Sequence, residues 1–155
     1  MDGSDAPDRA LVELADAVLA LAHQLELRGH AARNVAPLTG SEVTVLREVR
    51  RQPGVTATRI AAVTGSQRSY VSALAHALEQ RDLLERCDAV EGGRGVGFRL
   101  TPRALEEYRL VERYWVERLR AAPEAVLAGA AGVGRVLDEI ARAVAESGRE
   151  TTPAG

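Results

Sequence analysis

Hydrogen-bonding side chains are concentrated in one short stretch near the middle of the chain, "SQRSYVS". An arginine guanidinium can donate two hydrogen bonds to guanine, a glutamine amide can pair with adenine, and serine hydroxyls can hold phosphates. The same side chains can equally form a polar helix face that only water contacts. The candidate contacts to a nucleic acid in this stretch are Ser66, Gln67, Arg68, Ser69, Tyr70 and Ser72.

A further cationic side chain, Arg94, lies in the glycine-rich stretch "EGGRG". Glycines relax the steric limits on the backbone, so such a stretch can project an arginine outward. A narrow minor groove of DNA has a strong negative potential, which attracts an inserted arginine. Arg94 is therefore a candidate minor-groove contact, and the alternative is an exposed arginine on a loose loop.

Residue patterns typical of catalysis or metal binding do not occur in the sequence. We find no nucleophile–base pair, no phosphate-binding loop and no pair of carboxylates on a glycine-rich scaffold. His23, His30 and His76 are widely spread, and the single cysteine, Cys87, cannot build a thiolate zinc site or an intramolecular disulfide. We expect no enzymatic activity, no metal and no cofactor, and we interpret Cys87 as a packing residue.

The arginines are unevenly distributed, although the net charge is only −2. Residues 39–103 contain ten arginines and seven acidic residues, whereas residues 1–38 and 104–155 are both net acidic. The net positive charge of residues 39–103 is compatible with a local anion-binding surface. No run approaches the roughly 18 apolar residues of a membrane span, and the acidic start "MDGSDAPDRA" lacks the order of a signal peptide. We therefore expect a cytoplasmic, nucleoid-associated protein that does not contact membranes.

Capping residues define the first helix of the basic region. "LTGSEV" predicts a helix start in which Thr39 is the N-cap and Glu42 its reciprocal partner in a capping box. Pro53 and Gly54 end this helix, because proline cannot continue the hydrogen-bond ladder and glycine favours a turn.

The candidate contacts lie in a pair of short helices that a hairpin follows. Thr56 can cap the first of these helices and Gly65 can end it, and an amphipathic helix then extends to about Arg81. Segments 84–89 and 96–101 are rich in β-favouring residues and flank the glycine-rich stretch, so they predict a hairpin. This order describes a winged helix-turn-helix, and the fold class is mainly α with a small β-hairpin wing. Thr56 and Thr58 join the candidate DNA contacts.

Helices with one apolar face are predicted at both ends of the chain. Apolar residues follow helical spacing from Leu11 to Leu25, and again from Val126 to Val144 after a break at Pro123. Such helices are expected to pack on each other or on a second subunit. The predicted organisation is a disordered N-terminus (1–9), an N-terminal helix for dimerisation (10–38), the winged lobe (39–103), C-terminal dimerisation helices (104–147) and a disordered tail (148–155).

The segment "IAAVTGSQRSYVSALAHALEQRDLLERCDAVEGGRGVGFRLTPRALEEY" resembles the multiple-antibiotic-resistance regulator (MarR) family of bacterial transcription factors. "LTGSEVTVLREV" is similar to that family's helix before the helix-turn-helix, and "LTPRALEEY" to its wing-to-helix junction, so the resemblance extends over most of the chain. It implies a homodimer that places two winged lobes on a pseudo-palindromic DNA operator, and a repressor that a small ligand releases. The alternative is a winged-helix module that binds a protein or senses a ligand without DNA affinity.

The resemblance also assigns individual positions. Arg68 falls in the family's recognition-helix motif together with Ser69, and Arg94 falls on the arginine of the wing's Asp-x-Arg pattern. The chain departs from the family at Gly92, which replaces that aspartate, and at two alanines of the recognition helix, Ala73 and Ala77, where relatives often carry basic residues. Fewer phosphate contacts lower the affinity and flatten its salt dependence, so we expect binding to depend on Arg68, the wing and dimer avidity.

A ligand pocket where the dimer helices meet each lobe is a further implication of the resemblance. The candidates for holding a small anionic or aromatic ligand are His23, His30, Arg33, Tyr108 and Trp115. The alternatives are a polar helix end near solvent for the first three, and the core or the dimer interface for the two aromatic residues.

Overall fold

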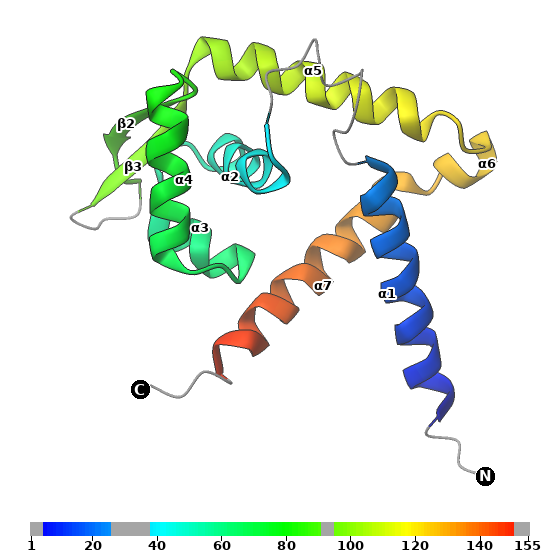
Figure 1. The fold of residues 1–155 in the computed structure, drawn as a ribbon. Helices are drawn as coiled ribbons and strands as arrows, with labels where there is room; N and C mark the ends of the chain where they lie inside the picture. The colour runs from blue at the N-terminus through cyan, green and yellow to red at the C-terminus, as the bar shows by residue number, and fades with distance from the viewer. Residues whose placement is uncertain (1–4, 26–37, 91–94, 151–155) are drawn as a thin grey trace.

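Seven helices and three short strands make up the part of the protein that the computed structural model describes, residues 5–25, 38–90 and 95–150 (Figure 1). In chain order they are α1 (Asp5–Leu25), α2 (Gly40–Arg51), β1 (Val55–Thr56), α3 (Ala57–Thr64), α4 (Arg68–Gln80), β2 (Leu84–Asp88), β3 (Val96–Leu100), α5 (Pro102–Leu119), α6 (Glu124–Leu127) and α7 (Ala130–Glu150). The predicted fold class, mainly α with a hairpin wing, is confirmed.

The predicted capping box begins α2. The Thr39 hydroxyl accepts a hydrogen bond from the backbone N–H of Glu42 (3.3 Å), and the Glu42 carboxylate accepts one from the backbone N–H of Thr39 (2.7 Å). Glu42 is buried, and its other carboxylate oxygen accepts a hydrogen bond from Arg81 at the end of α4 (2.8 Å). The cap therefore also ties α2 to α4.

The helix-turn-helix forms as the sequence predicts. Thr56 caps α3 by accepting a hydrogen bond from the backbone N–H of Arg59, and Gly65 ends α3 with a φ of 66°, which glycine adopts without strain. One face of α4 is buried in the core of the lobe. The largest fully buried side chains of this core are Leu46, Val49, Ile60, Val71, Leu78, Leu83 and Val111.

A third strand, β1, completes the wing sheet, and the sequence did not predict it. β1 contains only Val55 and Thr56, too few residues for an alternating pattern, and it pairs antiparallel with β3 to give the strand order β1-β3-β2. Gly97 lies opposite Thr56 and is buried against the backbone of Gly54. The hairpin is thereby joined to the start of α3.

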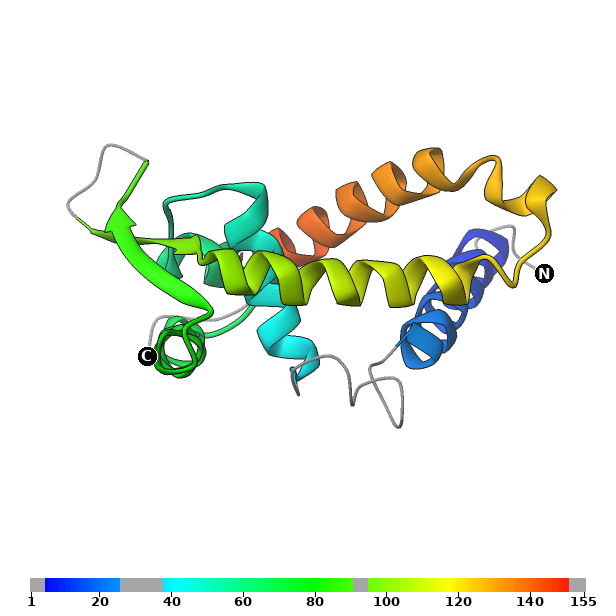
Figure 2. The same cartoon turned by 90° about the horizontal axis from the view of Figure 1, so that it is seen from above.

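The helices outside the lobe extend from it in a V. Figures 1 and 2 show α5 leading away from the sheet to α6, and α7 returning toward α3, while α1 lies near the far end of α5. The indole N–H of Trp115 on α5 donates a hydrogen bond to the carbonyl of Leu25 at the end of α1 (3.3 Å). Arg51 of α2 forms an ion pair with Asp138 of α7 (2.9 Å).

The ends of the predicted terminal helices need correction. Residues 5–9 and 148–150 were predicted to be disordered, but they continue α1 and α7, because the apolar spacing marks only the amphipathic part of a helix. The segment after Pro123 is also two helices rather than one, with a break at Ala128 and Gly129. None of the described helices is both long and apolar enough to cross a bilayer.

Candidate nucleic-acid interface

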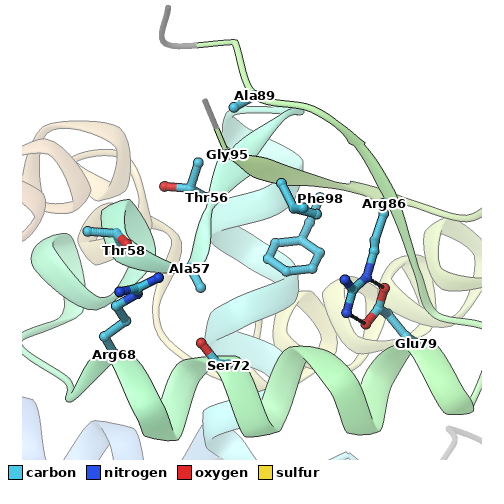
Figure 3. Close-up of a pocket in the computed structure, with 11 residues that line it drawn as sticks. Thr56, Ala57, Thr58, Arg68, Ser72, Glu79, Arg86, Ala89, Gly95 and Phe98 are labelled. Carbon is cyan, nitrogen blue, oxygen red and sulfur yellow. Dashed lines mark hydrogen bonds and ion pairs between the residues drawn. The ribbon is translucent and has the colours of Figure 1, made fainter. Parts of the chain in front are cut away.

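A groove of about 470 Å³ lies between α4 and the wing sheet (Figure 3). Thr56, Thr58, Arg68 and Ser72, all predicted as DNA contacts, line it. In Figure 3 the side chain of Arg68 extends from the first turn of α4 toward Thr58 on α3. The groove therefore brings residues of the strand β1, of α3 and of α4 to one surface.

The other predicted contacts surround the start of α4 without lining this groove. Gln67, Ser69 and Tyr70 are exposed, whereas Ser66 is half-buried and its hydroxyl accepts a hydrogen bond from the Thr64 hydroxyl (3.0 Å). Arg94 lies outside the described residues, so its predicted role stays a prediction.

The outer face of α4 is exposed along its length. Ser69, Ser72, Ala73 and His76 are all exposed, as the helical spacing predicts. Val71, Ala75 and Leu78 on the opposite face are buried and hold the helix in the lobe. The helix thus has a polar, solvent-exposed face. Arg68, which lines the groove, lies in the first turn of the helix.

Two charged residues that the sequence did not single out close the far end of the groove. Arg86 on β2 donates from Nε and from Nη2 to the two carboxylate oxygens of Glu79 on α4 (2.6 and 3.1 Å). These hydrogen bonds raise the pKa of Arg86, and His76 Nδ1 lies 3.9 Å from the same carboxylate. No spacing rule joins Glu79 to Arg86, because their contact depends on the turn between α4 and β2.

That turn has an unusual backbone. Asp82 has a φ of 57°, in the left-handed region that residues other than glycine seldom adopt. Its backbone N–H bonds to the carbonyl of Glu79, and its own carbonyl accepts a hydrogen bond from the Thr101 hydroxyl (2.7 Å). Thr101 also caps α5, so one hydroxyl links the turn after α4 to the helix that leaves the lobe.

The pairing of β2 with β3 decides which arginines of the sheet face the groove. Arg86 pairs with Phe98, and both line the groove, since directly paired residues share a face. The next pair, Glu85 and Arg99, points to the opposite face, where the two side chains form an exposed ion pair (3.5 Å).

The predicted ligand-pocket residues are only partly brought together. Tyr108 is buried, and its ring meets that of Trp115 edge-on with 6.2 Å between the centroids. Burial raises the pKa of the Tyr108 hydroxyl, and the charge of Arg47 acts in the opposite direction. His23 is exposed on the last turn of α1, while His30 and Arg33 lie outside the described residues.

A hollow of about 350 Å³ adjoins Tyr108 between α2 and α5. Three arginines of α2 line it with Tyr108 and Glu112: Arg47, Arg50 and Arg51. The guanidinium of Arg50 lies 5.0 Å from the centre of the Tyr108 ring and forms an ion pair with Glu112. These arginines were not among the predicted site residues, although their i, i+3 and i+4 spacing on α2 places them on one face of the helix.

A family model described as the MarR family matches residues 36–95, from just before α2 to the wing. This match confirms the resemblance to the MarR family for residues 36–95. The matched segment contains every groove-lining residue named above except Phe98. A comparison with curated protein sequences finds no match.

Solved structures with the same winged-helix fold extend the likeness to most of the chain. The transcriptional repressor CouR, bound to a 23-mer DNA duplex, is 22% identical with a TM-score of 0.66, covering 92% of this chain and 99% of CouR. A MarR-family transcriptional regulator from Rhodococcus sp. RHA1 is 17% identical with a TM-score of 0.65 over 90% of this chain and 98% of its own. PcaV from Streptomyces coelicolor, in complex with its natural ligand, is 19% identical with a TM-score of 0.53, covering 90% of this chain and 96% of PcaV.

Proposed function

We propose that this protein is a dimeric transcription regulator that binds pseudo-palindromic duplex DNA. In this proposal α4 enters the major groove, Arg94 of the wing reaches the minor groove, and the protein acts in the cytoplasm by binding rather than by catalysis. The observation that carries the proposal is the groove beside α4, which Thr58, Arg68 and Ser72 line together.

The shape and chemistry of this surface suit duplex DNA. The major groove is wide enough for an α-helix, and the exposed polar face of α4 projects from the lobe because its opposite face is buried. The first turn carries Arg68, whose guanidinium can bond the two acceptors of guanine. Hydroxyls of Thr58 and Ser72 can hold phosphates on either side of that contact. The DNA-bound state of CouR supports the same use of this fold.

The dimer is proposed from the apolar surface of the terminal helices. Leu14 and Val18 on α1 and Ile140 on α7 are each 39% exposed, and Val133 and Val144 on α7 are 58% and 64% exposed. Exposed apolar helix faces of this kind mark interaction sites in folded proteins. A second copy of the chain covers it in the proposed dimer, and a two-fold axis accounts for a palindromic operator.

Replacing Arg68 by alanine is expected to weaken DNA binding by about tenfold or more, because a bidentate arginine–base contact contributes about 1–3 kcal/mol. The measurement is fluorescence anisotropy with duplex from the intergenic region upstream of the protein's own gene, at low and at moderate salt. Arg99→Ala is the matched control, since it removes the same charge from the sheet face opposite the groove.

Absence of binding by the wild-type protein at low salt would contradict the DNA proposal. Equal affinities of the wild type and Arg68→Ala would contradict the assigned role of α4. The first result would favour a winged-helix module that binds a protein or a ligand instead of DNA.

We further propose that a small ligand controls a repressor through the region around Tyr108. The hollow there combines an aromatic ring with the guanidinium of Arg50, which suits an anionic aromatic molecule. PcaV, solved with its natural ligand, supports a ligand-binding role for this fold.

The single tryptophan, Trp115, reports on this region because its ring touches that of Tyr108. Salicylate, used as an anionic aromatic probe, is expected to quench the Trp115 fluorescence in a saturable manner. Arg50→Ala is expected to weaken that binding by about tenfold, the effect of losing one hydrogen bond to a charged group. Linear, non-saturating quenching that is the same in both proteins would contradict the site.

A further inference from the structure

The ion pair of Arg86 and Glu79 occupies an unexpected place for an acidic side chain. It lies in the groove beside α4, the surface that would face the phosphate backbone of bound DNA. The side chain of Glu79 is 16% exposed and that of Arg86 is 60% exposed. The carboxylate is thus largely covered, and the arginine is the member of the pair that solvent reaches.

The geometry of the pair leaves one edge of the guanidinium available. A guanidinium has five N–H donors in a rigid fork, and the bonds to Glu79 come from Nε and Nη2. Neither bond uses Nη1, and Figure 3 shows the remaining nitrogen of Arg86 pointing toward Phe98 and into the groove. A carboxylate that accepts two hydrogen bonds from one guanidinium fixes the orientation of its plane, and so fixes the direction of the remaining N–H donors.

We propose that Arg86 is a phosphate-binding residue for the DNA backbone and that Glu79 is a positioning residue that orients it. The inference rests on the proposed DNA-binding function and adds a contact at the wing end of the groove. Thr58, Arg68 and Ser72 lie toward the start of α4, and Arg86 lies at the other end of the same groove. A duplex backbone following the groove would meet hydrogen-bond donors at both ends.

This arrangement offers a substitute for cations that the recognition helix lacks. Ala73 and Ala77 on the exposed side of α4 cannot hold phosphates. Arg86 approaches the same groove from β2, where its pairing with Phe98 turns it toward α4. An arginine side chain that is already ordered in the free protein loses less conformational entropy when it binds a phosphate. One such contact therefore contributes more to the affinity than a contact from a flexible arginine.

The test measures DNA affinity as a function of salt for two matched pairs of variants. Arg86→Ala is expected to bind about tenfold more weakly, as for a lost hydrogen bond to a charged group. It should also lower the slope of log K against log salt by about 0.9 per protomer, because one phosphate contact is lost. The control pair Arg99→Ala and Glu85→Gln, on the opposite face of the same sheet, should leave both the affinity and the slope close to wild type.

Glu79→Gln separates positioning from simple charge. Removing an acidic group near DNA should strengthen binding if the carboxylate only repels phosphates. If Glu79 positions Arg86, the affinity should change in the opposite direction: Glu79→Gln should bind DNA about threefold more weakly. The salt slope should stay unchanged, because Arg86 keeps its charge and loses only its fixed orientation. Stronger binding by Glu79→Gln would overturn the positioning role.

The double variant Arg86→Ala/Glu79→Gln tests the remaining explanation, that Arg86 only masks Glu79. It should stay as weak as Arg86→Ala, and recovery of wild-type affinity would overturn the phosphate contact. Arg86→Lys keeps the charge without the fork and is expected to bind weakly with a wild-type slope, so it tests the contact even if Arg86→Ala unfolds. If the wild type binds DNA and Arg86→Ala binds with the same affinity and salt slope, this inference alone is refuted. If the wild type does not bind DNA, the proposed function is refuted too.

Discussion

Gly97→Ala is expected to lower the free energy of unfolding by about 3 kcal/mol, the upper part of the range for overpacking a tight site. A Cβ atom at this position would lie 2.8 Å from the carbonyl carbon and 2.9 Å from the Cα of Gly54. Both neighbours are backbone atoms, so no side-chain rotation relieves the clash. The substitution must separate β3 from β1, which carries Thr56 at the start of α3.

Gly95→Ala is the matched control for this prediction. Its added Cβ would approach only the Thr56 Cγ2 atom at 3.7 Å, an ordinary van der Waals contact, and we expect a change within about 0.5 kcal/mol. Urea unfolding followed by circular dichroism measures both variants. If Gly97→Ala were as stable as Gly95→Ala, the close approach of β3 to Gly54 would not exist in solution.

DNA binding should fall together with the stability of Gly97→Ala. Phe98 and Val96 of β3 line the groove beside α4, so displacing β3 moves one wall of the proposed interface. We expect weaker binding even under conditions where the variant stays folded, which anisotropy at low temperature can measure.

Val18→Asp is expected to convert the proposed dimer to a monomer. Val18 lies in the apolar stripe of α1, and a carboxylate there would lose its hydration when a partner covers it, at a cost of several kcal/mol. The monomer would hold one winged lobe instead of two, so the apparent affinity for a palindromic duplex should fall by about a hundredfold, the lower end of typical avidity gains. Light scattering after size exclusion gives the mass, and anisotropy gives the affinity.

The fold of the lobe should survive this substitution. Among the described residues, the buried core runs from Leu38 to Val111 and contains no residue of α1. Val12→Asp is the control, because Val12 lies off the apolar stripe formed by Leu11, Leu14, Val18 and Leu21, so this variant should remain a dimer. A wild-type protein that is monomeric, or a Val18→Asp variant that stays dimeric, would contradict the role proposed for α1.

Local signals in the sequence predicted most of the winged lobe. The capping box of Thr39 and Glu42, the Thr56 cap and the left-handed Gly65 each depend on contacts within a few residues, and all are confirmed. The buried and exposed faces of α4 follow from helical periodicity alone. Such features can be derived from a single sequence because neighbouring residues determine them.

Only one end of the candidate interface could be predicted from the sequence. Thr58, Arg68 and Ser72 were predicted as DNA contacts on or beside α4; the structure places them along the groove, and their role in binding stays a prediction. Arg50 and its neighbours beside Tyr108 were missed, since their role appears only when α2 packs against α5. The roles of Arg94, His30 and Arg33 stay predictions.

By itself, then, the sequence determined the helices of the lobe, the hairpin and the face of α4 that meets solvent, since periodicity and capping are local properties. Only the tertiary structure decided that the two residues of β1 join the wing sheet, and that Glu79 accepts hydrogen bonds from Arg86 across the turn at Asp82. Both depend on strand register and on a left-handed turn, which bring together atoms whose separation along the chain predicts no contact.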